Sequence, residues 1–128
     1  MSQEIIYSYT RAQAIEDGVL VDVSTMAREA GFLYPVAVTS ALHSGYIVPD
    51  SQAAHNGNSV EGRLWDVLNV LRYEIRRASG SLLLFKVIFT TGKQNGKGCY
   101  QQTVTLKSIC GPGDNAEPVI TIMLPEED

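Results

Sequence analysis

The stretch SVEGRLWDVLNVLRYEIRRA, residues 59–78, decides how the rest of the chain is arranged. Its apolar residues recur at intervals of three and four, the period of one face of an α-helix, and Trp65 widens that face by one position. Ser59 is a favoured N-cap residue, and Gly80 ends the segment. The pattern predicts an amphipathic central helix over residues 59–79. Its apolar face comprises Val60, Leu64, Val67, Leu68, Leu71 and Ile75.

The segment after this helix is rich in strand-forming residues. Leu82–Thr91 is apolar at nearly every position, which predicts a strand covered on both faces, one of them by the helix. This strand and Tyr100–Ile109 flank a run of turn formers, residues 92–98, and so predict a β-hairpin. Val119–Leu124 supplies a third strand after a glycine-rich turn. Residues 82–124 are therefore expected to form an antiparallel β-meander.

Residues 1–48 alternate between short strand patterns and short helix patterns. Hydroxyl residues and glycines bracket the two helices, as N-caps and C-terminal stops do. The expected elements are a strand at Glu4–Tyr9, a helix at Arg11–Asp17 ended by Gly18, a strand at Val19–Val23, a helix from Ser24 or Thr25 to Ala30 closed by Gly31, a strand within Phe32–Thr39, a helical turn at Thr39–Ser44 and a small strand at Tyr46–Val48. Residues 49–58 are polar and predict a surface loop.

The elements together predict an α+β fold in one domain, residues 1–128. An antiparallel sheet, made of the meander and the N-terminal strands, packs on one long central helix. A chain of 128 residues with 45% hydrophobic residues buries a core without disulfides or a structural metal. Residues 125–128 form an acidic tail, which we expect to project into solvent and to contribute little to folding.

The two cysteines indicate a reducing compartment. Cys99 and Cys110 lie at opposite ends of a predicted strand, roughly 35 Å apart when extended, whereas a disulfide needs Cα atoms within about 7 Å. We expect free thiols. No signal peptide and no apolar run of about 18 residues is present in the sequence. A cytoplasmic protein without a membrane partner is the expectation.

Charge follows an acid, base, acid order along the chain. Residues 1–59 carry six acids and two bases, residues 60–109 carry eight bases and three acids, and residues 110–128 carry five acids and no base. Either these blocks neutralise one another across the folded surface, or an acidic face imitates nucleic acid or meets a basic partner.

Basic residues at the end of the central helix are one candidate binding site. Arg72, Arg76 and Arg77, with Lys93 and Lys97 of the hairpin loop, are able to gather around phosphate, and Tyr73 is able to stack on a base. The alternative is a solvated helix face. The pI near 5.1 disfavours a nucleic-acid partner, because such binding rests largely on phosphate neutralisation.

The turn Gly111-Pro112-Gly113-Asp114 is a second candidate site. Gly111 and Gly113 permit positive φ, and the backbone amides of such a loop form anion-binding nests, with Asp114 beside them. A plain turn between strands explains the same residues. His43 and His55 have no partner at ligand spacing, and no histidine is near Cys110 in sequence, so we predict no metal, catalytic or cofactor site.

Three segments of the sequence resemble a known family: residues 6–24, residues 62–68 and residues 110–125, which contain CGPGD and EPVITIMLP. The chain is similar to small uncharacterised proteins, with a domain of unknown function, that are encoded on bacterial plasmids, integrated elements and phages. The resemblance spans nearly the whole chain. It implies a mobile-element setting and assigns no catalytic residue.

Two functions are expected, from different classes. The first is non-catalytic binding of a macromolecule, by an accessory protein of a mobile element that inhibits or modulates a host protein of defence. The second is a nucleotide-using enzyme, because Tyr7-Ser-Tyr-Thr with the following helix resembles the first strand and helix of ADP-ribosyltransferase folds, where Glu117 is the candidate for the catalytic glutamate. The oligomeric state is left open.

Overall fold

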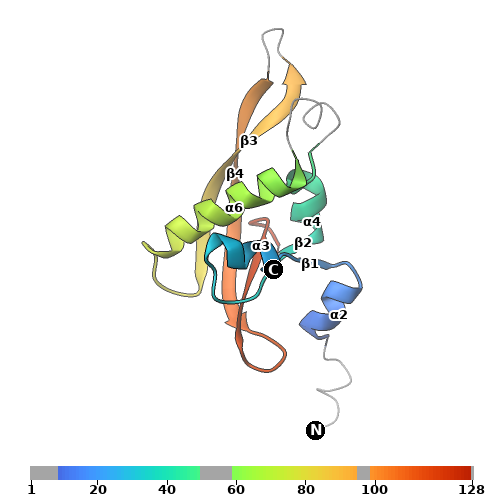
Figure 1. Cartoon of the computed structure of the whole chain (residues 1–128), viewed down its shortest axis with the longest axis vertical. Coiled ribbons are helices and arrows are strands. Elements are labelled where there is room, and N and C mark those ends of the chain that lie inside the picture. The colour runs from blue at the N-terminus through green and yellow to red at the C-terminus, as the bar shows by residue number, and fades with distance from the viewer. Residues whose placement is uncertain (1–8, 50–58, 95–98, 128) are drawn as a thin grey trace.

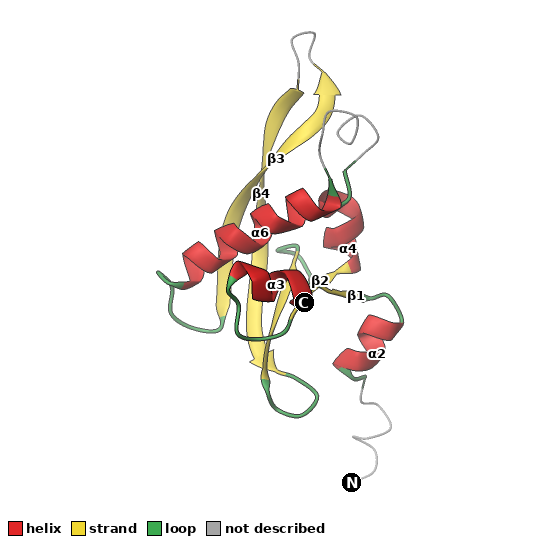
Figure 2. Ribbon diagram, in the orientation of Figure 1, coloured by secondary structure: helices red, strands yellow, loops and turns green. Residues whose placement is uncertain are grey.

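The computed structural model describes residues 9–49, 59–94 and 99–127 (Figures 1 and 2). Helices and strands combine in an α+β fold, as predicted. The elements are α2 (Arg11–Glu16), β1 (Leu20–Asp22), α3 (Ser24–Ala30), β2 (Val36–Thr39), α4 (Ser40–Leu42), the π-helix η1 (His43–Ile47), α6 (Val60–Ile75), β3 (Leu82–Gln94), β4 (Cys99–Pro112) and β5 (Pro118–Met123).

Five strands form a single sheet in the order β1-β2-β5-β4-β3. The predicted meander is confirmed, because β4 pairs antiparallel with both β3 and β5. The N-terminal strands join it through β2, which runs parallel to β5 with Val36 opposite Ile120. The sheet is therefore mixed, and the prediction of a purely antiparallel sheet is wrong. Apolar alternation shows which face of a strand is buried but carries no information on the direction of a distant partner strand.

Helix α6 begins as predicted and ends earlier. Ser59 is its N-cap, and its hydroxyl accepts a hydrogen bond from the Gly62 amide at 3.0 Å. After Ile75 the amides of Arg77 and Ala78 donate to carbonyls three residues back, so the α-helical pattern stops there. The helix has 16 residues and shares its side of the sheet with α3. The description as one long central helix is wrong.

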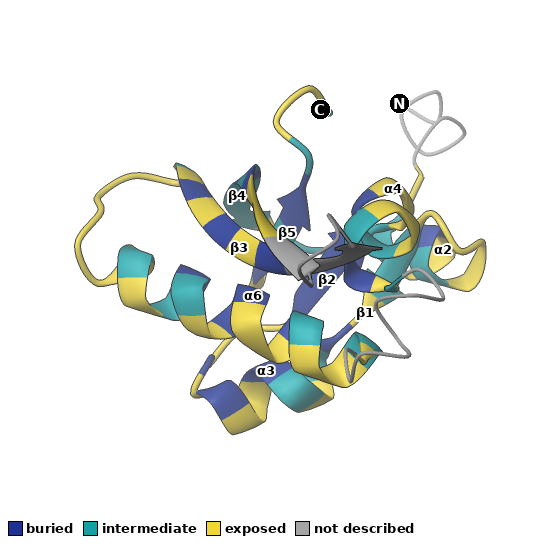
Figure 3. Ribbon diagram, turned by 90° about the horizontal axis from the view of Figure 1, so that it is seen from above, coloured by how far each residue is buried: buried dark blue, intermediate teal, exposed yellow. Residues whose placement is uncertain are grey.

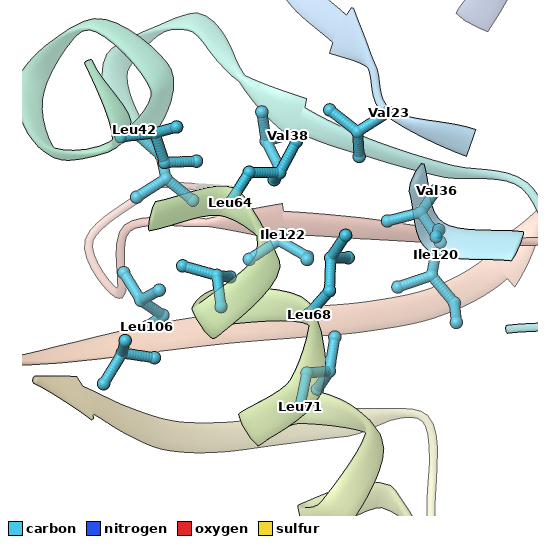
Figure 4. Close-up of a cluster of buried hydrophobic side chains, with 14 of the residues drawn as sticks. Val23, Val36, Val38, Leu42, Leu64, Leu68, Leu71, Leu106, Ile120 and Ile122 are labelled. Carbon is cyan, nitrogen blue, oxygen red and sulfur yellow. The ribbon is translucent and has the colours of Figure 1, made fainter. Parts of the chain in front are cut away.

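The core lies between one face of the sheet, called the inner face here, and the helices α6 and α3 (Figures 3 and 4). Four residues of α6 are buried, while Trp65 and Ile75, at the margins of the predicted stripe, are each 40% exposed. Each buried leucine contributes about 1.5–3 kcal/mol through removal of its side chain from water. The labelled core residues of Figure 4 are Val23, Val36, Val38, Leu42, Leu64, Leu68, Leu71, Leu106, Ile120 and Ile122.

The N-terminal units largely follow the prediction. Thr10 caps α2 in a capping box with Gln13. Helix α3 ends at its C-cap Gly31, whose φ is 104°. The N-cap of α3 is Val23 instead of a hydroxyl residue. The Ser24 hydroxyl has another role: it donates to Asp22 Oδ1 at 2.6 Å and accepts from the Val36 amide at 3.0 Å, which ties β2 to the start of α3.

Three other N-terminal predictions differ from the structure or cannot be compared with it. Strand β2 begins only at Val36, directly after Pro35. The small strand predicted at Tyr46–Val48 is wrong, because the helical turn after Thr39 continues as the π-helix η1. Most of the predicted strand Glu4–Tyr9, and the loop 49–58 beyond residue 49, lie outside the described residues.

The second face of the sheet, called the outer face here, carries α2 and the C-terminal segment. The guanidinium of Arg11 donates to Thr121 Oγ1 at 2.7 Å and thereby holds α2 against β5. Glu127 Oε1 accepts from Thr39 Oγ1 at 2.7 Å and from the Leu124 amide at 2.8 Å. Lys107 Nζ donates to the carbonyl of Glu127. The prediction that the acidic tail merely projects into solvent is therefore wrong for Glu127.

Candidate functional site

An uncovered part of the outer face, on β3, is the first candidate site. Leu82, Leu84 and Ile88 are 54%, 55% and 54% exposed, and we call these three residues the exposed β3 row. Phe85, Val87 and Phe89, at the intervening positions, are buried against α6. The alternation is visible along β3 in Figure 3 as dark blue and yellow bands. The prediction that both faces of this strand are covered is wrong.

The arrangement of the outer face explains why this row has no cover. Over the β2–β5 half of that face, Ala37, Val119 and Met123 are at most 4% exposed. The covering elements do not extend to Leu82, Leu84 and Ile88 of β3, which stay exposed. Across the register, Leu84 faces Lys107 and Ile88 faces Thr103, so two of the three side chains of the row have a polar neighbour on β4. Leu82 faces Ile109.

The backbone of β3 adds a second property to the site. This strand is at the edge of the sheet and has 13 residues, whereas β1 at the other edge has three. One row of its N–H and C=O groups has no strand beside it in the described structure. A long edge with apolar side chains is the arrangement to which another extended chain adds. Lys86 stands in the middle of the row and is exposed.

The predicted basic site on α6 separates into different contacts. The side chain of Arg72 lies across Gly31 at the C-terminal end of α3, where a cation is favoured. Arg77 lies over the ring of Tyr73, with its Cζ 5.5 Å from the ring centroid. Arg76 is the exposed C-cap residue of α6. Arg72 and Arg77 therefore make contacts within the protein itself.

The hairpin lysines lie elsewhere. Arg76 and Arg77 precede the start of β3, whereas Lys93 is near its end, eleven positions beyond Leu82 and thus roughly 36 Å along the strand. Lys97 lies outside the described residues. The structure does not bring the arginines and Lys93 together into one patch.

The predicted turn site has partners within the protein. Gly111 lies inside β4, opposite Val119. The Gly113 amide donates to the Glu117 carbonyl at 2.6 Å, and the Asn115 amide donates to Glu117 Oε1 at 2.9 Å. These amides close the hairpin between β4 and β5, and a role for the turn in anion binding stays a prediction.

The same turn meets the start of α2. Asp114 accepts hydrogen bonds from the amides of Arg11 and Ala12, at 2.7 and 3.0 Å. Burial lowers the pKa of Arg11, while the nearby carboxylates of Asp22, Asp114 and Glu117 act in the opposite direction. Glu117, the candidate glutamate of the enzyme hypothesis, thus belongs to the turn that meets the start of α2, whereas Tyr7 is outside the described residues.

The exposed β3 row was not predicted, because a continuous apolar run is typical of a strand buried on both faces. One signal was present. Lys86 is two positions from both Leu84 and Ile88, so the three side chains point to the same face of the strand. A charged residue there indicates that this face is in contact with water.

Within the described ranges, no three side chains of His, Cys, Asp or Glu are close enough to hold a metal ion. None of the helices in those ranges is long and apolar enough to cross a membrane. Cys110 is a free thiol, as predicted.

The fold and the surface define a small α+β protein with a mixed five-stranded sheet, part of which is left uncovered. The chain belongs to a family of unknown function, DUF6573, whose model matches residues 1–128. No curated protein and no solved structure matches the chain.

Proposed function

We propose that this protein is a non-catalytic binding protein that docks another protein against the exposed β3 row and the free edge of β3. The observation that carries the proposal is the exposure of Leu82, Leu84 and Ile88, each more than half accessible on one face of an edge strand. Exposed apolar side chains that are adjacent on a rigid strand favour association, because their burial in an interface releases water.

The chemistry of the edge indicates the kind of partner. An extended segment of the partner adds to β3 through main-chain hydrogen bonds, and its apolar side chains cover the row. Lys86 lies in the middle of the row, and lysines at such positions disfavour pairing of an edge with a copy of itself. The partner is therefore a different protein, with a carboxylate placed to meet Lys86.

The setting of this binding follows from the resemblance of the sequence to proteins of plasmids, integrated elements and phages. In that setting the protein is a cytoplasmic accessory factor of a mobile element, and the partner is a host protein, with a defence protein as the candidate. Inhibition or modulation by occupation of a surface needs no catalytic residue in the bound protein.

A photo-crosslinking experiment tests the proposal. Benzoylphenylalanine replaces Leu84 in the exposed β3 row, or Tyr73 on the opposite, α6 side as a matched control, and each protein is irradiated in host lysate. Tyr73 is 59% exposed, so both positions are accessible to solvent. We expect a host protein to be crosslinked from position 84 only. Purified partner is then tested for binding to Leu84→Glu, with loss of affinity as the expected result.

Two outcomes contradict the proposal. Equal crosslinking from positions 84 and 73 means that the exposed β3 row is not the docking surface. A product of twice the chain mass from purified protein alone identifies a second copy, not a host protein, as the occupant of the edge.

The alternative, a nucleotide-using enzyme, is favoured by one observation: the start of α2 is hydrogen-bonded to Asp114 in the β4–β5 turn, and Glu117 belongs to the same turn. Thermal shift with NAD and with nucleoside triphosphates tests it. Stabilisation of the wild type that is lost in Glu117→Gln supports the enzyme, and no shift at millimolar nucleotide contradicts it.

A further inference from the structure

A cavity of about 190 Å³ lies at the inner face of the sheet, beneath the C-terminal end of α6. The turn that joins α6 to β3 forms one wall, and its position is fixed because the Cys110 amide donates to the Ser81 carbonyl at 2.8 Å. Tyr34 and Ile75 line the cavity too, and both are partly exposed, so its mouth opens to solvent. The deeper lining residues are Leu83, Ser108, Cys110 and Ile120.

Ser108 gives this cavity a polar group. It is 4% exposed, and it is the single polar residue found buried in the described part of the chain. On the neighbouring strands the register places Leu83 and Ile122 beside it, and both are apolar. Its side-chain hydroxyl has no hydrogen bond to another described residue, and its oxygen is not among the fully enclosed polar atoms without a partner, so it faces the cavity.

Water that enters the open cavity bonds to this hydroxyl. A ligand that displaces the water keeps the hydrogen bond if it carries a group that bonds to Ser108 Oγ. Apart from the hydroxyl groups of Tyr34 and Ser81 near the mouth, the other lining side chains are apolar or, as in Cys110, weakly polar, and no charged side chain lies there. The cavity therefore selects against ions and favours a neutral molecule that is mostly apolar.

We propose that this cavity is a binding site for a small neutral aromatic molecule with one hydroxyl or carbonyl group, which forms a hydrogen bond with Ser108. An apolar cavity of about 150 Å³ accommodates benzene, so the volume here suits a ring compound of roughly six to ten non-hydrogen atoms. The ring packs between Leu83, Ile75 and Ile120, and Cys110 Sγ lies beside it, where sulfur–aromatic contacts are favourable.

Phenol and toluene are suitable as a matched pair of test ligands, because they have the same shape and only phenol has a hydroxyl. Each is titrated into ¹⁵N-labelled protein, and amide shifts give the site and the Kd. We expect both ligands to shift amides near Ser108, Cys110 and Ile75, with phenol bound about tenfold more tightly. In Ser108→Ala that preference disappears.

A readout without ligand separates this role from a structural one. If the Ser108 hydroxyl has no partner, Ser108→Ala leaves the Tm of the free protein unchanged or raises it. A lower Tm means that the hydroxyl already has a structural partner and overturns the proposal. Cys110→Leu, which fills the cavity, serves as a second variant and should abolish the shifts from both ligands.

Three further results also overturn the proposal. They are equal affinities of phenol and toluene for the wild type, shifts that Cys110→Leu leaves in place, and no saturable shift from either ligand at millimolar concentration. The cavity is on the opposite face of the sheet from the exposed β3 row, so failure here leaves the crosslinking test of the docking surface unaffected.

Discussion

The backbone amide of Arg11 donates a hydrogen bond of 2.7 Å to Asp114 Oδ1, although 103 positions separate the two residues. The second carboxylate oxygen accepts from the Ala12 amide, so Asp114 caps the N-terminus of α2 from the opposite end of the chain. The Arg11 guanidinium completes the link with its hydrogen bond to Thr121 Oγ1. In the sequence this turn is a candidate site for binding an anion. In the structure the turn instead supplies one, the Asp114 carboxylate, which holds α2 on the outer face.

We predict that Asp114→Ala destabilises the protein by about 1–2 kcal/mol, because two amides at the start of α2 lose their acceptor. Asp66→Ala is the control, since Asp66 is an exposed residue of α6, and we expect a change within about 0.5 kcal/mol. Urea titration monitored by circular dichroism gives both values. Equal stability of the two variants would mean that this cap contributes nothing.

Gly31 and Arg72 allow a double-mutant test of the contact between α3 and α6. Gly31 has φ 104°, and a Cβ there would overlap with the guanidinium of Arg72, whereas Gly18 at φ 81° has open space around it. Alanine at either position is strained by about 1–2 kcal/mol. We expect Gly31→Ala to cost about 1 kcal/mol more than Gly18→Ala, through displacement of Arg72.

The extra cost should vanish when Gly31→Ala is made together with Arg72→Ala, because the overlap is then absent. Denaturation of the two single variants and the double variant measures the coupling. Additive effects would show that Arg72 does not restrict the space above Gly31.

Tyr9 and Asp17 give a prediction on pH. The Tyr9 hydroxyl donates to Asp17 Oδ2 at 2.8 Å, and this hydrogen bond raises the pKa of Tyr9 above its ordinary value of 10.0. A raised pKa means that the interaction stabilises the folded state below pH 10 and is lost as the pH rises through the folded value. Asp17→Ala should lower the pKa of Tyr9, and Glu16→Ala should not. NMR titration of ring-labelled tyrosines, with Tyr9→Phe for assignment, measures it.

The elements that sequence predicted well are those determined by local chemistry. Ser59 and Thr10 begin helices through their own side chains, and Gly31 ends one because its φ is positive. The hairpin follows from two apolar runs around turn-forming residues. Each of these features depends on residues close together in the chain.

What sequence did not predict depends on contacts between distant residues. The parallel pairing of β2 with β5 and the cap from Asp114 both join the N-terminal part to residues beyond 110. The cover of the outer face likewise depends on where α2 and residues 124–127 lie, so the exposed β3 row was not recognisable from an apolar run alone. The arginines of the predicted basic site were recognised as exposed cations, but their contacts with Gly31 and Tyr73 require the fold.

The C-terminal segment gives a prediction that reverses the expectation from sequence. Glu127→Ala removes the acceptor of Thr39 Oγ1 and of the Leu124 amide, and we expect a loss of about 1–2 kcal/mol. Glu126 is exposed, so Glu126→Ala should have an effect within about 0.5 kcal/mol. Thermal denaturation of the two variants at equal ionic strength makes the comparison. An unchanged Tm for Glu127→Ala would mean that the hydrogen bonds of Glu127 do not stabilise the fold, as expected for a solvated tail.

Two leucines on opposite sides of the sheet provide the most direct test of which surfaces are covered. Leu68 of α6 is fully buried, and Leu84 of β3 is 55% exposed. Leu68→Ala should cost about 2–5 kcal/mol, because it leaves a cavity between α6 and the sheet. Leu84→Ala should change the free energy of unfolding by less than about 0.5 kcal/mol. Urea titration measures both, and Arg77→Ala, expected to stay within about 1 kcal/mol, controls for loss of a long side chain on α6. A cost at Leu84 comparable to that at Leu68 would show that the exposed β3 row is covered in the free protein, and the docking surface proposed for a partner would then not exist.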